Sequence, residues 1–136
     1  MRSRAAPRIR IKRAYERASR DDGARVLVDR LWPRGVSRQA LALDEWAKDI
    51  APSDQLRRWF GHDPRRWKEF VSRYREELRA PAARERLEAL ARRARARPLT
   101  LVYGARDEQH NDAVVIADAL RRRSRRVARS APRRAA

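Results

Sequence analysis

Two short apolar segments of the sequence each run directly into a cluster of polar and chain-turning residues. Residues 26–28 lead into the cluster 29–35, and residues 99–103 lead into the cluster 104–111. Both segments have the length and composition of buried strands. If the two strands are parallel neighbours, both clusters emerge at the carboxyl-end edge of one sheet, which is where open α/β sheets bind ligands. The pattern therefore predicts a site at that edge.

The rest of the pattern predicts one further strand, several helices and one long connection. Polar and apolar residues alternate over 8–13, which favours an edge strand that pairs with the next strand in the chain. Residues 32–52 are expected to form a long, irregular connection with one short helical piece, and such loops are often functional. Helices are expected over 54–60, over 64–79, after Pro81, and over a last segment that contains 113–120.

A stripe of aromatic residues follows the predicted helices. It consists of Trp59, Phe60, Trp67, Phe70 and Tyr74. The spacings of three and four residues place these rings on one helix face, and burial of each ring contributes on the order of 1.5–3 kcal/mol. A base-stacking surface needs exposed rings. We therefore expect the stripe to belong to the core between helices and sheet.

The length and composition fit one compact domain. The chain has 136 residues, and chains of about 100–150 residues usually form a single core. We expect a domain over 8–122, a basic N-terminal tail over 1–7 and an Arg-rich C-terminal tail over 123–136. The absence of cysteine excludes disulfides, thiolate nucleophiles and Cys-ligated zinc. Without an apolar run of ~20 residues or a secretory signal, we expect a cytoplasmic protein with no membrane partner.

The formal net charge of +18 is concentrated near the two ends of the chain. Residues 21–120 carry 20 basic and 17 acidic side chains, whereas 1–20 and 121–136 carry eight basic side chains each. Basic tails hold phosphate backbones by releasing counterions, so non-specific nucleic acid is one expected partner. The alternative is a GC-rich coding bias, which alone would generate 33 arginines against three lysines. No recognisable nucleic-acid-reading motif accompanies the charge.

Four ordered motifs resemble those of a known family. They are VDRLWPRG at 28–35, WAKDIAPS at 46–53, LRRWFGHDP at 56–64, and TLVY at 100–103 followed by His110-Asn111. Through these motifs, from about Ile9 to Leu120, the chain resembles the domain-of-unknown-function family 488 (DUF488), in its YeaO-like branch. The resemblance implies a small α/β, Rossmann-like three-layer domain of bacterial type, with a short, mostly parallel sheet and flanking helices. It implies no settled reaction.

The two clusters contain candidate acid–base residues. Asp29, Asp107 and His110 are the candidate catalytic residues, because a histidine beside carboxylates transfers protons near neutral pH. Asn111 is interpreted either as the cap of the last helix or as a ligand contact. Tyr103 either plugs the top of the core or donates a hydrogen bond to a ligand.

Cationic residues form a second group of candidates. Arg30, Arg34 and Lys48 are suited to hold a phosphate or a carboxylate, arginine through a two-pronged grip. The same residues fit internal ion pairs with nearby aspartates equally well. His62 joins the ligand-binding set, since it lies just before a capped helix. No spacing of His, Asp or Glu enforces a metal site, and the sequence identifies no cofactor.

Two classes of function fit these residues. The first is a small enzyme, a hydrolase or transferase that acts on a phosphorylated or nucleotide-like ligand. The alternative is a non-catalytic protein that senses an anionic ligand in the same pocket or holds nucleic acid through its tails. Substrate, reaction and oligomeric state are left open by the sequence. The enzyme and the ligand sensor both require residues 29–35 and 103–111 to line one shared cavity.

Overall fold

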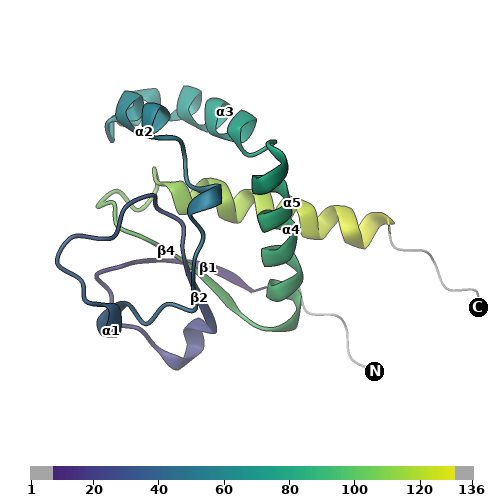
Figure 1. The fold of residues 1–136 in the computed structure, drawn as a ribbon. Coiled ribbons are helices and arrows are strands. Elements are labelled where there is room, and N and C mark those ends of the chain that lie inside the picture. Colours follow the sequence, from purple (N-terminus) through teal and green to yellow (C-terminus); the bar gives the residue numbers. More distant parts are fainter. Residues whose placement is uncertain (1–7, 131–136) are drawn as a thin grey trace, which may run out of the picture.

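A parallel four-stranded sheet forms the centre of the protein in the computed structural model, which describes residues 8–130 (Figure 1). The strands are β1 (Ile9–Arg13), β2 (Ala24–Leu27), β3 (Glu45–Trp46) and β4 (Leu99–Tyr103). They lie in the order β1-β4-β2-β3, and each neighbouring pair is parallel. The predicted α/β class is confirmed, and so is the parallel pairing of the two apolar strands β2 and β4.

The neighbour predicted for β1 is wrong. The alternating pattern of 8–13 predicts pairing with the next strand in the chain, but β1 pairs with β4, so that Ile9 lies opposite Leu99. All five residues of β4 are buried, whereas Arg10 in β1 is exposed. The fully buried strand takes the central position because both of its faces need covering, and β1 is left at the edge.

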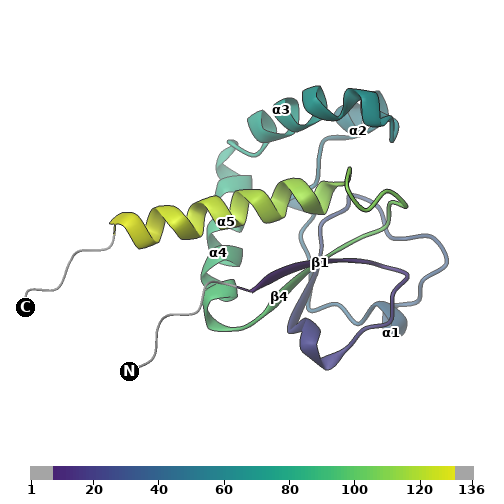
Figure 2. The same ribbon diagram turned by 180° about the vertical axis from the view of Figure 1, so that it is seen from behind.

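Helices flank the sheet on both faces (Figures 1 and 2). The α-helices are α1 (Arg38–Leu41), α2 (Asp54–Phe60), α3 (Trp67–Glu77), α4 (Pro81–Ala96) and α5 (Asp112–Ser130), and the short 3₁₀ turns are η1 (Arg20–Asp22), η2 (Lys48–Ile50) and η3 (Pro64–Arg66). The larger helices α3, α4 and α5 cover one face, while α1 and the connection around it cover the other. Ser53 caps α2 by accepting the Leu56 N–H at 3.1 Å, as expected of this sequence.

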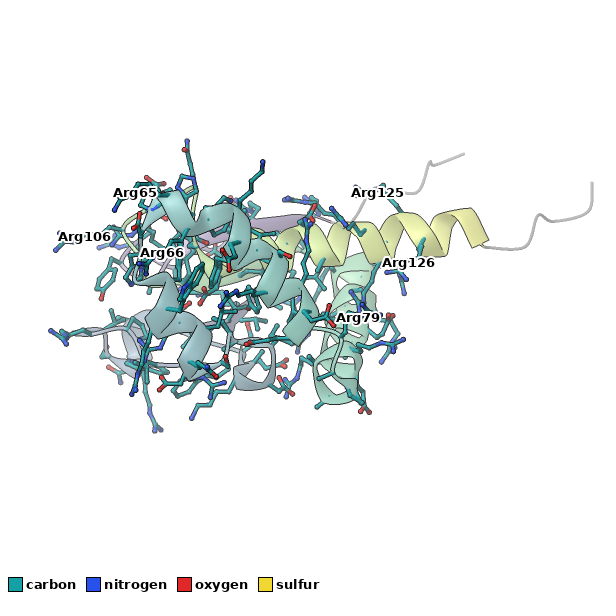
Figure 3. The ribbon with its side chains drawn as sticks, turned by 90° about the horizontal axis from the view of Figure 1, so that it is seen from above. Arg65, Arg66, Arg79, Arg106, Arg125 and Arg126 are labelled. Carbon is teal, nitrogen blue, oxygen red and sulfur yellow. The ribbon has the colours of Figure 1, made fainter. Side chains whose placement is uncertain are left out.

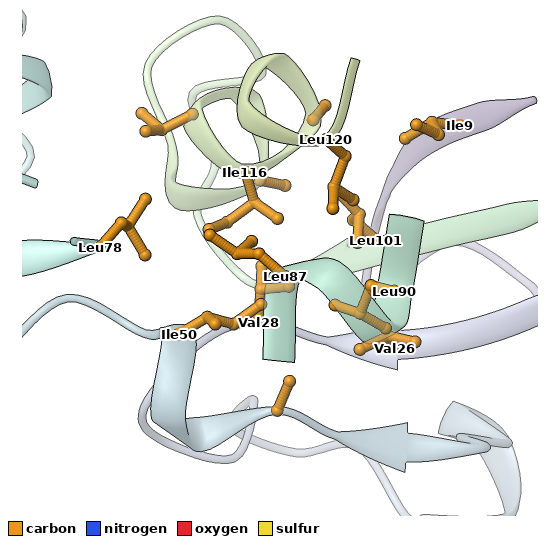
Figure 4. Packing of buried hydrophobic residues seen from close by; sticks show 14 of the residues in the cluster. Ile9, Val26, Val28, Ile50, Leu78, Leu87, Leu90, Leu101, Ile116 and Leu120 are labelled. Atoms are coloured by element: carbon orange, nitrogen blue, oxygen red, sulfur yellow. The ribbon is translucent and has the colours of Figure 1, made fainter. Parts of the chain in front are cut away.

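Side chains of alternate residues in the central strands pack into two separate hydrophobic cores. Val26 and Leu101 face the larger core, which α4 and α5 complete (Figure 4). Leu27 and Val102 face a smaller core that is closed by Leu41 and by partly buried tryptophans. In the aromatic stripe, Phe60, Phe70 and Tyr74 are buried, and Trp59 and Trp67 pack against them partly exposed. The predicted core role of the stripe is confirmed.

Two segments differ from the predicted boundaries. The connection after β2 contains not only the short helix α1 but also the two-residue strand β3 and the turn η2. Helix α5 continues to Ser130, past residue 122, because its Ala- and Arg-rich sequence has a high helix propensity. The predicted tail 1–7 and the end of the second tail, 131–136, lie outside the described residues. Within 8–130, no helix has the length and apolarity needed to cross a membrane.

A buried ion cluster fixes the amino-terminal end of the sheet. The Asp22 carboxylate accepts hydrogen bonds from Arg25 at 2.7 Å and from Lys12 at 3.0 Å. It also accepts the Ser19 N–H, and Thr100 donates to the Asp22 carbonyl. Burial raises the pKa of the Asp22 carboxyl, but the hydrogen bonds outweigh burial and hold the pKa below its usual value. The cluster ties β1, β2 and β4 together.

Replacement of Asp22 by alanine is expected to destabilise the fold by about 3–5 kcal/mol, because it leaves the Arg25 guanidinium buried without its partner. Urea denaturation at pH 7 measures the change. Asp21→Ala is the matched control, since Asp21 is exposed in the same turn, and it is expected to change stability by less than about 0.5 kcal/mol. Equal stability of the two variants would contradict the role assigned to Asp22.

Candidate functional site

A cavity of about 230 Å³ lies at the carboxyl-end edge of the sheet. Its wall is built from residues 29–34 after β2 and from residues within 104–112 after β4. Arg57, Phe60 and other side chains of the α2–α3 region close it from the helical side. The two polar clusters therefore open into one shared cavity, which is the arrangement that both predicted classes of pocket require.

Two carboxyl groups meet in this cavity. Asp29 follows the end of β2 by two residues, Asp112 is the first residue of α5, and both side chains lie in the cavity wall. Two carboxyl groups this close form a hydrogen bond only when one of them carries a proton, because a carboxylate only accepts. Asp29 Oδ2 also accepts the Gly104 N–H at 2.8 Å. A Cβ at Gly104 would lie 3.3 Å from that oxygen, so the glycine permits this close approach.

The pKa values of both carboxyls are raised. Burial is the main cause at Asp29, and it is partly offset by the hydrogen bonds from Asp112 and Gly104. At Asp112, burial raises the pKa well above its usual value, and the negative charge of Asp29 raises it further. Their mutual hydrogen bond lowers the pKa of Asp29 and raises that of Asp112. Of the two carboxyls, Asp112 is therefore the one that binds a proton more readily.

Three arginines contribute to the cavity wall. Arg30 donates through Nε to the Pro52 carbonyl at 3.1 Å, which anchors its stem. Arg34 is exposed at the rim. Arg57 donates to the Asp54 carboxylate at 2.6 Å, while its buried Nε has no hydrogen-bond partner among the described residues. The wall thus offers guanidinium groups beside the carboxyl pair.

The candidate His110 is held by Asp107. The two side chains are joined by a 2.8 Å contact between Asp107 Oδ2 and His110 Nδ1. Hydrogen bonds from the Gln109 backbone and from His110 lower the pKa of Asp107, so this carboxyl stays ionised and accepts the Nδ1 proton. Nε2 of His110 is then the nitrogen that is left for a ligand.

The core aromatics also position both histidines. Trp67 packs edge-on against the His110 ring, with the centroids 5.2 Å apart, and Phe60 lies 6.3 Å from His62. His62 has a φ of 57° and follows Gly61 with a φ of 53°. This left-handed turn ends α2 and places His62 in the cavity wall.

Six of the nine predicted site residues line the cavity. They are Asp29, Arg30, Arg34, His62, His110 and Asn111. Asp107 lies behind His110 as its positioning partner. Asn111 also caps α5, because its side chain accepts the Val114 N–H at 3.2 Å.

Lys48 and Tyr103 are not part of the cavity wall, so the structure does not bring these two into the predicted site. Lys48 Nζ lies 3.9 Å above the Trp46 ring, where a cation–π contact holds it. Tyr103 is buried in the larger core, because strand alternation turns its ring toward the helices.

Sequence reasoning missed Asp112 and Arg57 as cavity residues. Asp112 carries a usable signal, since it is an acidic residue in the first turn of a helix that starts at the ligand-binding edge. Arg57 carries no such signal in the sequence, because its place in the cavity wall depends on how α2 packs. Within 8–130, no three His, Cys, Asp or Glu side chains gather as metal ligands would.

Comparisons with known proteins identify relatives of unknown activity. Residues 8–135 match a family model described as the inactive DUF488-N3 subclade. The chain is 43% identical over 113 residues to uncharacterized proteins of Mycobacterium tuberculosis and Mycobacterium bovis, covering 83% of this chain and 93% of each relative. It is 44% identical over 113 residues to the uncharacterized protein YeaO of Escherichia coli, covering 83% and 96%. No solved structure matches the chain.

The carboxyl pair gives a prediction for stability against pH. Because the pKa of Asp112 is higher in the folded than in the unfolded chain, the folded state binds the proton more tightly, and this stabilisation is lost as the pH rises through the folded value. Asp112→Asn keeps a hydrogen-bond donor for Asp29 and removes the titration. Its melting temperature, relative to the unmodified protein, is expected to increase from pH 5 to pH 9.

Asp118→Asn is the matched control for this experiment, since Asp118 lies on the same helix and is partly exposed. Its difference from the unmodified protein is expected to stay nearly constant over the same pH range. Circular dichroism melting curves measure all three proteins. A constant offset for Asp112→Asn as well would show that the carboxyl pair does not share a proton.

Proposed function

Since the chain belongs to the DUF488 family, in its YeaO-like branch, and matches a subclade described as inactive, we propose that it binds a small ligand without converting it. The ligand is phosphate-containing, either a sugar phosphate or the ribose-phosphate part of a nucleotide. One observation carries this proposal, namely that guanidinium groups and a pair of carboxyl groups occupy the wall of the same cavity.

The arginines supply the anion-binding part of the site. Guanidinium groups match phosphate geometry with two parallel N–H donors. Arg34 at the rim has no side-chain partner among the described residues, and the Nε of Arg57 is a buried donor that is also unpaired. The exposed guanidinium of Arg34 is therefore available to a phosphate, which favours an anionic ligand.

The carboxyl pair supplies the part of the site that binds hydroxyl groups. Asp29 and Asp112 offer acceptor oxygens to sugar hydroxyls, and the shared proton keeps the pair from repelling a nearby phosphate with two full charges. Trp32 and Phe60 add apolar wall against which a sugar ring packs. The cavity of about 230 Å³ is smaller than the ~300–1,000 Å³ that drug-sized ligands occupy, so a sugar phosphate fits better than a dinucleotide.

Thermal-shift and calorimetric titrations with ribose 5-phosphate, AMP, inorganic phosphate and ribose test the proposal. Ribose 5-phosphate or AMP is expected to stabilise the protein by about 2.7 kcal/mol when present at a hundred times its dissociation constant. Ribose alone is expected to bind much more weakly, because it leaves the arginines without an anion. Absence of binding by every phosphate compound would overturn the proposal.

Arg34→Gln is expected to weaken phosphate-ligand binding about 10- to 100-fold, the worth of one charge-assisted hydrogen-bonded contact. Arg38→Gln is the control, since Arg38 is exposed on α1 and does not line this cavity. Its affinity is expected to match that of the unmodified protein. Equal losses in both variants would assign the effect to net charge and not to the site.

A hydrolase or transferase is the second candidate function, and the protonated carboxyl beside an oriented histidine favours it. In such an enzyme, Asp112 acts as the general acid and His110 as the base. Product formation from the same phosphate compounds is the test. Turnover that is lost in Asp112→Asn while ligand binding persists would replace the proposal of binding without conversion.

A further inference from the structure

Arginines from separate helices gather at the end of the molecule away from the cavity. Arg121 of α5 donates to the Ile9 carbonyl at the start of β1, at 2.9 Å. The Leu99 N–H of β4 donates to the Arg8 carbonyl, also at 2.9 Å. Arg97 ends α4 two residues before β4 begins. The end of α4, the start of β1 and the middle of α5, around Arg121, therefore lie at the amino-terminal end of the sheet, and the last turns of α5 project beyond them (Figures 1 and 2).

We define the basic corner as six exposed arginines of these two helices. They are Arg92, Arg95 and Arg97 at the end of α4, and Arg122, Arg125 and Arg126 in α5. Figure 3 shows Arg125 and Arg126 on the projecting part of α5, far from Arg65, Arg66 and Arg106 at the cavity end. The basic corner and the cavity thus lie at opposite ends of the domain.

The charges of the basic corner are largely unneutralised. In the described part of the chain, Arg122 pairs with Asp118, and the other five arginines of the corner form no ion pair. At the cavity end, Arg65 and Arg66 both pair with Asp63, and Arg58 pairs with Asp54. Two exposed arginines at that end, Arg34 and Arg106, form no ion pair among the described residues. Unpaired like charges repel one another and attract a polyanion. The corner is therefore one place where unpaired positive charge of the described residues is available to a partner.

The spacing along α5 fits a chain of phosphates. Arg122 lies three residues from Arg125 and four residues from Arg126, so the Cβ atoms of each of these two pairs are about 5–6 Å apart. Arg125 and Arg126 are consecutive and point to different sides of α5 (Figure 3). Extended guanidinium groups at these positions reach phosphates on either side of the helix. Phosphate contacts of this kind supply affinity and no sequence information.

The surroundings favour nucleic acid over a lipid surface. A helix that lies in a membrane interface needs large apolar side chains opposite its basic face. The exposed large hydrophobic residues among those described are Tyr15 and Leu31, and both line the cavity at the other end. The basic corner thus has neither an apolar anchor for a bilayer nor an exposed ring on which bases stack.

We propose that the basic corner binds the phosphate backbone of double-stranded nucleic acid without reading its sequence. This binding site lies on the folded domain and uses none of the residues that line the cavity. It differs from the binding predicted for terminal tails, because it assigns the contact to helical arginines at fixed spacing.

Fluorescence anisotropy with the full chain and a labelled 20-base-pair DNA duplex of mixed sequence tests this inference at several salt concentrations. The triple variant Arg92→Gln/Arg95→Gln/Arg125→Gln is expected to bind at least about 10-fold more weakly at about 100 mM salt. Its slope of log affinity against log salt is expected to fall by nearly 3, at about 0.9 for each phosphate contact removed. Glutamine is a good helix former, so the helices persist. Replacement of the same three arginines by lysine is expected to retain binding.

The matched control Arg17→Gln/Arg38→Gln/Arg106→Gln removes the same net charge from exposed positions outside the corner. It is expected to keep the affinity and the salt slope of the unmodified protein. Equal losses in both triple variants would overturn the proposal in favour of diffuse charge, and unchanged binding in the corner variant would place the contact elsewhere. Binding to phosphatidylserine vesicles as tight as binding to the duplex would also overturn it.

Discussion

The hydrogen bond from the Gly104 N–H to the Asp29 carboxylate joins the exits of two neighbouring strands, and the cavity depends on it. Parallel pairing of β2 with β4 places Leu27 opposite Val102, so the two chains leave the sheet side by side. The side chain of Asp29 then holds the exit of β4 with one oxygen and contacts Asp112 as well. Both loops and the first turn of α5 are thereby fixed around one point.

This dual role of Asp29 bears on the proposed lack of turnover. An aspartate that serves as a nucleophile or base needs a free oxygen directed at the substrate. Here the carboxylate already accepts a backbone N–H and a hydrogen bond from its partner Asp112. Such a carboxylate is well suited to stay in place and accept hydrogen bonds from the hydroxyl groups of a ligand. The same pair remains the observation that favours an enzyme, which is why the comparison of turnover with binding distinguishes the two functions.

Local sequence patterns predict most of the helices and strands. The features that they do not predict depend on long-range packing. The apolar runs of β2 and β4 and the spacing of Phe70 and Tyr74 predict their structures, because the periodicity is set by burial on one or both faces. The position of β1 beside β4 is not predicted by these patterns, because it depends on which strand must bury both of its faces. Lys48 does not line the cavity because it makes a cation–π contact with Trp46. Arg57 lines the cavity because of the way in which α2 packs.

Helix α5 connects the two regions for which binding is proposed. Its 19 residues span about 28 Å at about 1.5 Å per residue, with Asp112 at one end and Arg125 and Arg126 near the other. The two proposed surfaces therefore belong to one continuous helix. A substitution that alters how α5 packs on the sheet is expected to change the position of both.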